Sequence, residues 1–249
     1  MSLLESLAVV VAGLLAGMIN AVVGSGTLIT FPTLLALGVP PVTANVSNTV
    51  GLVPGSFSGA YGYRRELHGQ GRRIARLGVG SALGGITGGL LLLVLPESAF
   101  EAIVPALILL GCALVILGPR ISAATAHHRR GAHGGVALFA GIFGLGIYGG
   151  YFGAAQGILL VAVLSIALDD DLQRINALKN VLAGIVNLTA ALLFIAVADV
   201  DWQIALLIAI GAVAGGLLGA RVGRRLPNSV LRGVIVVVGV TVSVWLILT

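Results

Sequence analysis

The chain has 249 residues, of which 58% are hydrophobic and 9% are charged, and its mean hydropathy is +1.10. A soluble domain of this size could not cover so much apolar surface, so the composition excludes a soluble protein and indicates a membrane protein with several spanning helices. The formal net charge of +5 suggests a nucleic-acid partner. We instead assign the excess of arginine to loops that fix the orientation of the protein in a membrane, and we expect no nucleic-acid partner.

Ten apolar stretches follow one another along the chain, and most are long enough for a spanning helix, which needs about 20 residues. Their bounds are 3–23, 27–39, 42–63, 76–95, 99–118, 135–150, 152–168, 175–198, 202–220 and 229–248. The second, sixth and seventh are short, so they are predicted to be tilted, discontinuous or re-entrant. The predicted fold is an all-α polytopic membrane protein in which about eight to ten of these segments cross the bilayer.

The first ten residues, MSLLESLAVV, include the acidic Glu5 and no basic residue. A signal peptide begins with a basic segment, so we expect a retained first helix rather than a cleaved signal peptide. The single cysteine, Cys112, lies in an apolar stretch and excludes a disulfide framework. Neither a catalytic triad nor a Walker A phosphate loop occurs in the sequence. We therefore expect no enzyme, no catalytic residue, no cofactor and no metal site.

The basic residues are distributed asymmetrically between the loops. If all ten stretches cross, one side of the membrane receives the loops 64–75, 119–134, 169–174 and 221–228. All 14 basic residues lie in or toward these loops, whereas the opposite side has only acidic residues. Because cytoplasmic loops are rich in arginine and lysine, we predict that the arginine-rich loops are cytoplasmic and that both termini lie outside the inner membrane.

The two halves of the sequence resemble each other at an offset of 131 residues. The matching glycines are Gly80, Gly84, Gly85 and Gly88 in the first half and Gly211, Gly215, Gly216 and Gly219 in the second. Two halves of five crossings must have opposite orientations because five is odd. We therefore predict two inverted repeats, residues 1–118 and 135–249, joined by a basic cytoplasmic linker at 119–134. A chance match between glycine-rich helices that pack closely is the alternative.

Several longer motifs identify a family. The first half contains G-x3-G-x-I-N-A-x2-G-S-G at Gly13–Gly26 and A-N-V-S-N at Ala44–Asn48. The second half contains Y-G-G-Y-F-G-A-A-Q-G at Tyr148–Gly157 and A-L-K-N at Ala177–Asn180. With these motifs the chain resembles, over nearly its whole length, the TauE/SafE family of sulfite-exporter-like permeases. The resemblance implies movement of small anions, notably sulfite, organosulfonates or related organic anions, across the bacterial inner membrane.

Small polar groups inside the glycine-broken apolar stretches are candidates for a binding site at membrane depth. The substrate-binding candidates are Ser25, Gly26, Thr27, Asn48, Gln156, Gly157, Lys179 and Asn180. The second-tier candidates are Asn20, Asn45, Ser47, Thr49, Asn176 and Asn187. The turns at Gly26 and Gly157 can present the partial positive charge of a helix N-terminus to an anion, or they can be simple hinges. Asn48 and Asn180, which pair if the repeat register slips by one, can donate to an anion or join helices.

Lys179 is the only lysine, and it lies about four residues inside the eighth apolar stretch. An ionisable group inside a membrane segment is costly, so we predict that it attracts or neutralises an anionic substrate. The alternative is a lysine that extends its ammonium into the lipid headgroups.

We predict a secondary transporter, acting as an exporter, that moves small anions by alternating access between the two repeats. The alternatives are a passive anion channel and an intramembrane subunit that transports nothing. The negative interior of the cell favours exit of an anion by about 2.3 kcal/mol per charge per 100 mV. Coupling to protons is possible. No carboxylate inside an apolar stretch is suited to carry the proton, however, because every acidic residue lies in a loop or at the end of a stretch.

Overall fold

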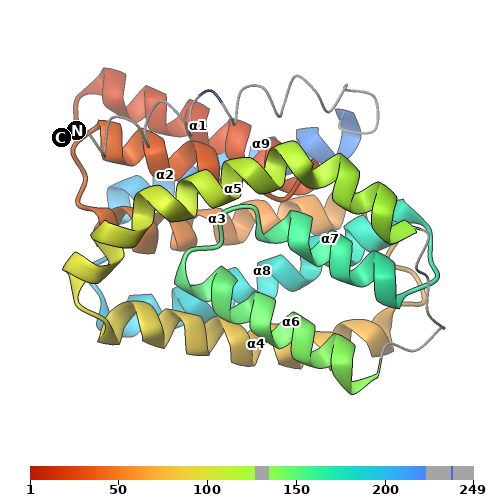
Figure 1. The fold of residues 1–249 in the computed structure, drawn as a ribbon. Helices are drawn as coiled ribbons and strands as arrows, with labels where there is room; N and C mark the ends of the chain where they lie inside the picture. The colour runs from red at the N-terminus through yellow and green to blue at the C-terminus, as the bar shows by residue number, and fades with distance from the viewer. Residues whose placement is uncertain (127–134, 223–236, 238–249) are drawn as a thin grey trace.

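The computed structural model describes residues 1–126, 135–222 and Val237. Among them it has nine α-helices and no strand (Figure 1). Their bounds are α1 (Leu3–Val22), α2 (Thr27–Ala36), α3 (Pro41–Gly62), α4 (Gly71–Val94), α5 (Glu97–Ala126), α6 (Val136–Tyr151), α7 (Gln156–Ala167), α8 (Leu172–Val197) and α9 (Trp202–Val222). The all-α prediction is confirmed for this part of the chain, whereas the predicted stretch 229–248 lies outside it apart from Val237.

Five of the described helices are long and apolar enough to cross a membrane, namely α1, α4, α5, α8 and α9. Helix α3 is comparably long, at 22 residues, but it is less apolar because it carries buried asparagine, serine and threonine side chains. Helices α2 and α7 have 10 and 12 residues, which correspond to about 15 and 18 Å of helix. The hydrocarbon core of a bilayer is about 30 Å thick, so neither α2 nor α7 can cross it alone.

The short helices belong to two hairpins, α1–α2 and α6–α7, whose tips meet inside the bundle. In Figure 1 the α1–α2 hairpin opens toward the left and the α6–α7 hairpin opens toward the right. The backbone N–H of Gly157 in the second tip donates to the carbonyl of Gly24 in the first, at 2.9 Å. Gly24 has φ +86°, and a Cβ there would lie 2.4 Å from the Gly157 Cα. Both tips therefore depend on glycine for their close approach.

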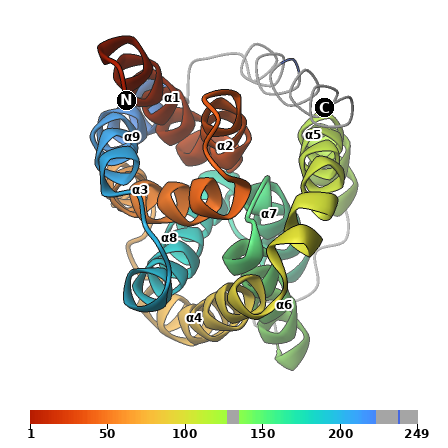
Figure 2. The same ribbon diagram turned by 90° about the vertical axis from the view of Figure 1, so that its left-hand side faces the viewer.

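Glycine also sets the packing of the long helices around the hairpins. Figure 2 shows α1 beside α9 and α4 beside α6. A Cβ at Gly84 or Gly88 of α4 would lie 2.3 Å or less from a backbone oxygen of α6, and one at Gly215 or Gly219 of α9 would lie 2.6 Å or less from one of α1. The two glycine runs therefore let α4 and α9 pack closely against α6 and α1.

An aromatic cluster in the core fixes α2 and α5 against the α6–α7 tip. The ring of Phe31 in α2 meets the ring of Phe152 edge-on, with centroids 5.1 Å apart. Phe100 of α5 contacts Phe31 at 6.3 Å and Tyr151 at 5.6 Å in the same edge-on manner. Such edge-to-face pairs add to the stability gained by burying the rings, and here they tie both hairpins to one core.

The loops α3–α4 and α7–α8 lie together at one end of the bundle. Arg174 donates to a carboxylate oxygen of Asp170 at 2.8 Å and to the carbonyl of His68 at 3.2 Å, and Arg73 donates to the other oxygen of Asp170. Partial burial of Asp170 by itself raises its pKa. The hydrogen bonds from Arg73 and Asp171 and the charge of Arg174 outweigh this effect, so the pKa of Asp170 lies below its ordinary value.

Two helices extend beyond the apolar stretches that predicted them. Helix α4 begins at Gly71 rather than at residue 76, and α5 continues to Ala126 rather than ending at residue 118. Hydropathy marks only the lipid-facing part of a helix, whereas backbone hydrogen bonds continue into polar surroundings. Part of the predicted linker at 119–134 is therefore helical, and its residues 127–134 lie outside the described chain.

Candidate functional site

Lys179 is buried inside the protein, with 1% of its surface exposed. Its Nζ atom donates to the carbonyl of Asn20 at 2.8 Å and to the carbonyl of Ala21 at 3.3 Å. Within the described part of the chain no carboxylate pairs with it. The alternative in which the ammonium extends into lipid headgroups is therefore not the arrangement seen here.

The end of α1 explains why these carbonyls accept the lysine. The last carbonyls of a helix have no partner within the helix and carry its partial negative charge. The chain turns back at Gly24, whose N–H and that of Val23 both donate to the Ile19 carbonyl, at 3.0 and 2.7 Å. The carbonyls of Asn20 and Ala21 are left for side chains from α8.

Two amides of α8 join the lysine at the same carbonyl. Asn176 and Asn180 donate through Nδ2 to the Ala21 carbonyl at 3.2 and 3.1 Å. We call Lys179, Asn176, Asn180 and the carbonyls of Asn20 and Ala21 the lysine cluster. Lys179 and Asn180 follow Asn176 by three and four residues, so all three side chains lie toward one face of α8.

Two buried polar atoms, one in the cluster and one in the α1–α2 tip, lack a hydrogen-bond partner among the described residues. They are Oδ1 of Asn176 and Oγ of Ser25, which is 1% exposed. Gly157, at the start of α7, lies against the lysine stem, because a Cβ there would be 2.9 Å from Lys179 Cδ. The hairpin tips thus cover the lysine cluster, and polar groups beside it have unused bonding capacity.

A second polar group lies next to the lysine cluster and shares Asn20 with it. Nδ2 of Asn20 and Nδ2 of Asn187 each donate to Oγ of Ser56, at 3.3 Å in both cases. Oγ of Ser56 donates to the Leu52 carbonyl at 3.0 Å. Helices α1, α3 and α8 are therefore joined by one chain of hydrogen bonds.

The remaining candidates of α3 are buried but belong to other contacts. Asn48 accepts a hydrogen bond from Thr30 of α2, and Asn45 donates to the Tyr151 carbonyl at the end of α6, at 2.9 Å. Ser47 accepts from the backbone N–H of Asp201 at 2.9 Å, and Thr49 donates to the Asn45 carbonyl at 2.8 Å. Asn48 has no hydrogen bond to the lysine cluster among those of the described residues.

The candidates at the hairpin tips have mixed environments. Thr27 and Gln156 are the first residues of α2 and α7, as expected for half-helix N-termini. Gln156 turns back and donates to the Leu145 carbonyl of α6 at 3.0 Å. Gly26 packs on α1, since a Cβ there would lie 2.5 Å from the Ala16 carbonyl oxygen.

Sequence reasoning missed Ser56, Thr30 and the Ala21 carbonyl. Ser56 and Thr30 are 4% and 1% exposed, and both are small polar residues inside apolar helices. The criterion that selected Ser47 and Thr27 could have found them. The carbonyl could not be found from side chains, since every residue has one.

The arrangement is suited to binding a small anion. A buried ammonium without an acidic partner is costly unless hydrogen bonds or a counter-charge compensate it. Here carbonyl dipoles compensate it only in part, and three side-chain donors converge on one oxygen. An anion with several oxygens would offer these donors a full negative charge.

Comparisons with known proteins identify the relatives of this chain. A family model described as "Sulfite exporter TauE/SafE" matches residues 9–246. The "Probable membrane transporter protein YfcA" of Escherichia coli (strain K12) is 29% identical over 94% of this chain and 86% of its own length. The "Probable membrane transporter protein ORF9" of Sinorhizobium sp. is 25% identical over 95% of this chain and 90% of its own. No solved structure matches the chain.

Proposed function

We propose that this chain, which belongs to the sulfite exporter TauE/SafE family, is a secondary transporter that exports small anions across the bacterial inner membrane. The family expected from the sequence motifs is confirmed, and the relatives are named as membrane transporters. Sulfite, organosulfonates and related organic anions are the proposed substrates. The description of the matching family model supports sulfite first.

The observation that carries this proposal is the buried Lys179 ammonium held by the carbonyls of Asn20 and Ala21. In the described conformation the Ala21 carbonyl occupies the donors of Asn176, Lys179 and Asn180. An arriving anion takes the place of this carbonyl, and the donors then contact its oxygens. Ser25 Oγ and the N-terminus of α2 complete the site from the hairpin tip.

We further propose that the protein consists of two inverted five-segment repeats that rock against each other. Three observations support this. The two hairpins open toward opposite ends of the bundle, α1 packs on α9 as α6 packs on α4, and Asn176 contacts the end of α1 as Asn45 contacts the end of α6. Asn45 and Asn176 are 131 residues apart, so their similar contacts favour one constant offset of 131 residues between the repeats. With this offset Asn48 corresponds to Lys179, and not to Asn180.

The proposal includes the orientation of the protein in the membrane and the driving force for anion export. The arginine-rich loops face the cytoplasm, and the electrical potential drives an anion outward by about 2.3 kcal/mol per charge per 100 mV. No carboxylate lies beside the lysine cluster in the described chain, so its own groups do not offer an acidic proton carrier. The termini would lie outside, with the α1–α2 hairpin entering from that side.

The test is flux of sulfite, a small sulfonate and a small carboxylate into proteoliposomes that contain the purified chain. Replacing Lys179 with Met should lower the initial rate by about 10–150-fold, the value of a charge-assisted hydrogen bond of about 1.5–3 kcal/mol. The variant should still fold, because an apolar replacement removes the cost of burying a charge. Thr189→Val is the control, since it changes a polar group of α8 that bonds only within its own helix, to the Ile185 and Val186 carbonyls.

Two outcomes would contradict the proposal. Equal flux in wild type and Lys179→Met would remove the lysine from the site. Flux that rises without saturation as the anion concentration increases would favour the passive channel instead. Lys179 is the only lysine, so peptide mapping distinguishes its reaction with an amine-reactive reagent from that of the N-terminal amine. Protection of the Lys179 peptide by the anion then reports binding independently of flux.

A further inference from the structure

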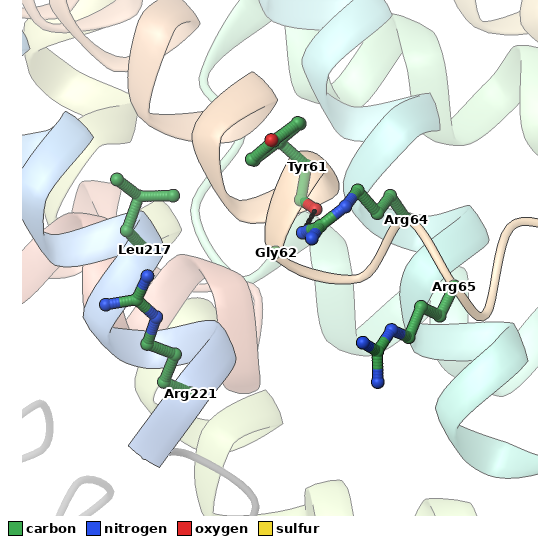
Figure 3. Close-up of a pocket in the computed structure, with 6 residues that line it drawn as sticks. All are labelled: Tyr61, Gly62, Arg64, Arg65, Leu217 and Arg221. Atoms are coloured by element: carbon green, nitrogen blue, oxygen red, sulfur yellow. Dashed lines mark hydrogen bonds between the residues drawn. The ribbon is translucent and has the colours of Figure 1, made fainter.

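A basic pocket lies at the end of the bundle where α3 and α9 finish, apart from the lysine cluster. Its volume is about 330 Å³. It is lined by Tyr61, Gly62, Arg64, Arg65, Leu217 and Arg221 (Figure 3). The proposed transport uses none of these residues.

The three arginines concentrate positive charge in this pocket. Arg64 lies over the ring of Tyr61, with its Cζ atom 4.6 Å from the centroid, and donates to the Tyr61 carbonyl at 3.3 Å. Among the described residues no carboxylate pairs with Arg64, Arg65 or Arg221. Three like charges repel one another, so the pocket favours a group that carries negative charge. Guanidinium groups match the oxygens of a phosphate in both charge and geometry.

The same two helices present an apolar surface directly beside the pocket. Phe57 lies one helical turn before Tyr61 on α3, and Val213 lies one turn before Leu217 on α9. Both are 37% exposed, and Tyr61 is 62% exposed. Ser58 of α3 donates to the Val213 carbonyl at 3.0 Å, so the helices touch at this depth. Apolar side chains at this level are suited to acyl chains, whereas the arginines at the helix ends are suited to a headgroup.

We infer that this pocket binds the phosphate group of an anionic phospholipid, with the acyl chains lying along Phe57 and Val213. A basic pocket between membrane helices is a typical binding site for acidic headgroups. A free phosphate ester would satisfy the arginines alone and would gain nothing from the apolar surface. The combination of both features in one place selects the lipid.

The test measures binding of phosphatidylglycerol to the full chain in neutral detergent by native mass spectrometry, with soluble glycerol phosphate as the second ligand. The double variant Arg65→Gln/Arg221→Gln should bind phosphatidylglycerol about 30-fold more weakly, since each arginine near a lipid headgroup contributes about fivefold. Arg72→Gln is the matched control, because Arg72 is an exposed arginine of the same end outside the pocket. It should leave binding unchanged. Arg65→Lys/Arg221→Lys should retain most of the binding.

Two results would overturn the inference. One is equal affinity of wild type and Arg65→Gln/Arg221→Gln for phosphatidylglycerol. The other is glycerol phosphate binding as tightly as the lipid, which would identify the pocket as a site for free anions. Thermal unfolding without lipid shows whether each variant is folded. Anion flux in neutral lipids separates this inference from the transport proposal, since the double variant should retain it.

Discussion

The two hairpins have similar architectures but different electrostatics at their tips. At the end of α1, the last carbonyls accept from Lys179, Asn176 and Asn180. At the end of α6, the corresponding side-chain contact among the described residues is the single one from Asn45 to Tyr151. Asn48 follows Asn45 by the three residues that separate Lys179 from Asn176, yet it bonds to Thr30. One framework therefore holds a cation at one tip and a neutral amide at the other, and the proposed anion chemistry belongs to the α1 end.

The largest effect is expected for a substitution at the contact between the two hairpin tips. Gly24→Ala should lower the free energy of unfolding by about 3 kcal/mol or more, because a left-handed backbone costs about 1–2 kcal/mol for alanine and the Cβ also overlaps Gly157. Gly38→Ala is the matched control, since Gly38 also has a positive φ, +79°, but open space around it. Gly38→Ala should lower the free energy of unfolding only by the cost of a left-handed backbone for alanine, about 1–2 kcal/mol. Equal losses of melting temperature in detergent for both variants would show that the tips do not touch.

The two helix-end asparagines should separate stability from transport. Asn45→Ala removes the side-chain donor to the Tyr151 carbonyl, so it should cost about 1–2 kcal/mol of stability with little change in flux. Asn176→Ala leaves the Ala21 carbonyl bonded to Lys179 and Asn180, so it should cost less stability but lower anion flux. Melting temperature and proteoliposome flux measured on both variants provide the check. The opposite pattern would place the anion at the α6 end.

Two buried serines, Ser25 and Ser81, test whether the anion binds at the α1–α2 hairpin tip. Oγ of Ser25 and Oγ of Ser81 are both buried without a partner in the described structure, but only Ser25 lies at a hairpin tip. Ser25→Ala should weaken anion binding by about tenfold, the value of one hydrogen bond to a charged group of about 1.5 kcal/mol. Ser81→Ala should leave it unchanged, and neither change should reduce the melting temperature. Equal binding by the two variants would exclude Ser25 from the site.

The smallest expected effect is on stability, and it concerns the α7–α8 connection, which is compared with the connection between α2 and α3. Asp170, between α7 and α8, pairs with Arg73 and Arg174, whereas the connection Leu37–Pro40 after α2 has no charged residue. Because folding lowers the pKa of Asp170, its contribution is complete above the ordinary carboxyl pKa near 4 and is lost as pH falls through the lower folded value. Asp170→Asn should remove about 1 kcal/mol or less at pH 7.

The pH dependence provides the control for this prediction. Wild type should lose the contribution of Asp170 on acidification below pH 4, and Asp170→Asn should lack that part of the loss. Asp199→Asn removes an exposed carboxylate at the opposite end of the bundle and serves as the control for the loss of one negative charge. An unchanged acid unfolding curve for Asp170→Asn would mean that the ion pairs contribute nothing.

The positions of the helices could be predicted well from the sequence, and the contacts of the site could not. Hydropathy and glycine located the break at residues 24–26, because local composition decides where a spanning helix must end. They placed the second break at residue 151, whereas α6 continues to Tyr151 and α7 begins only at Gln156. Sequence alone could not decide whether α2 and α7 cross, and their lengths of 10 and 12 residues answer that. Asn48 and Lys179 were predicted to share a site, but they contact different helices.

By itself, the sequence determined that this is a polytopic α-helical membrane protein of the TauE/SafE family with one lysine inside an apolar helix. Only the tertiary structure decided that this lysine meets the end of α1, together with Asn176 and Asn180. The physical reason is the range of the interactions. Burial and helix formation depend on neighbouring residues, whereas Lys179 and Ala21 are 158 positions apart and meet through a backbone carbonyl that no side chain identifies.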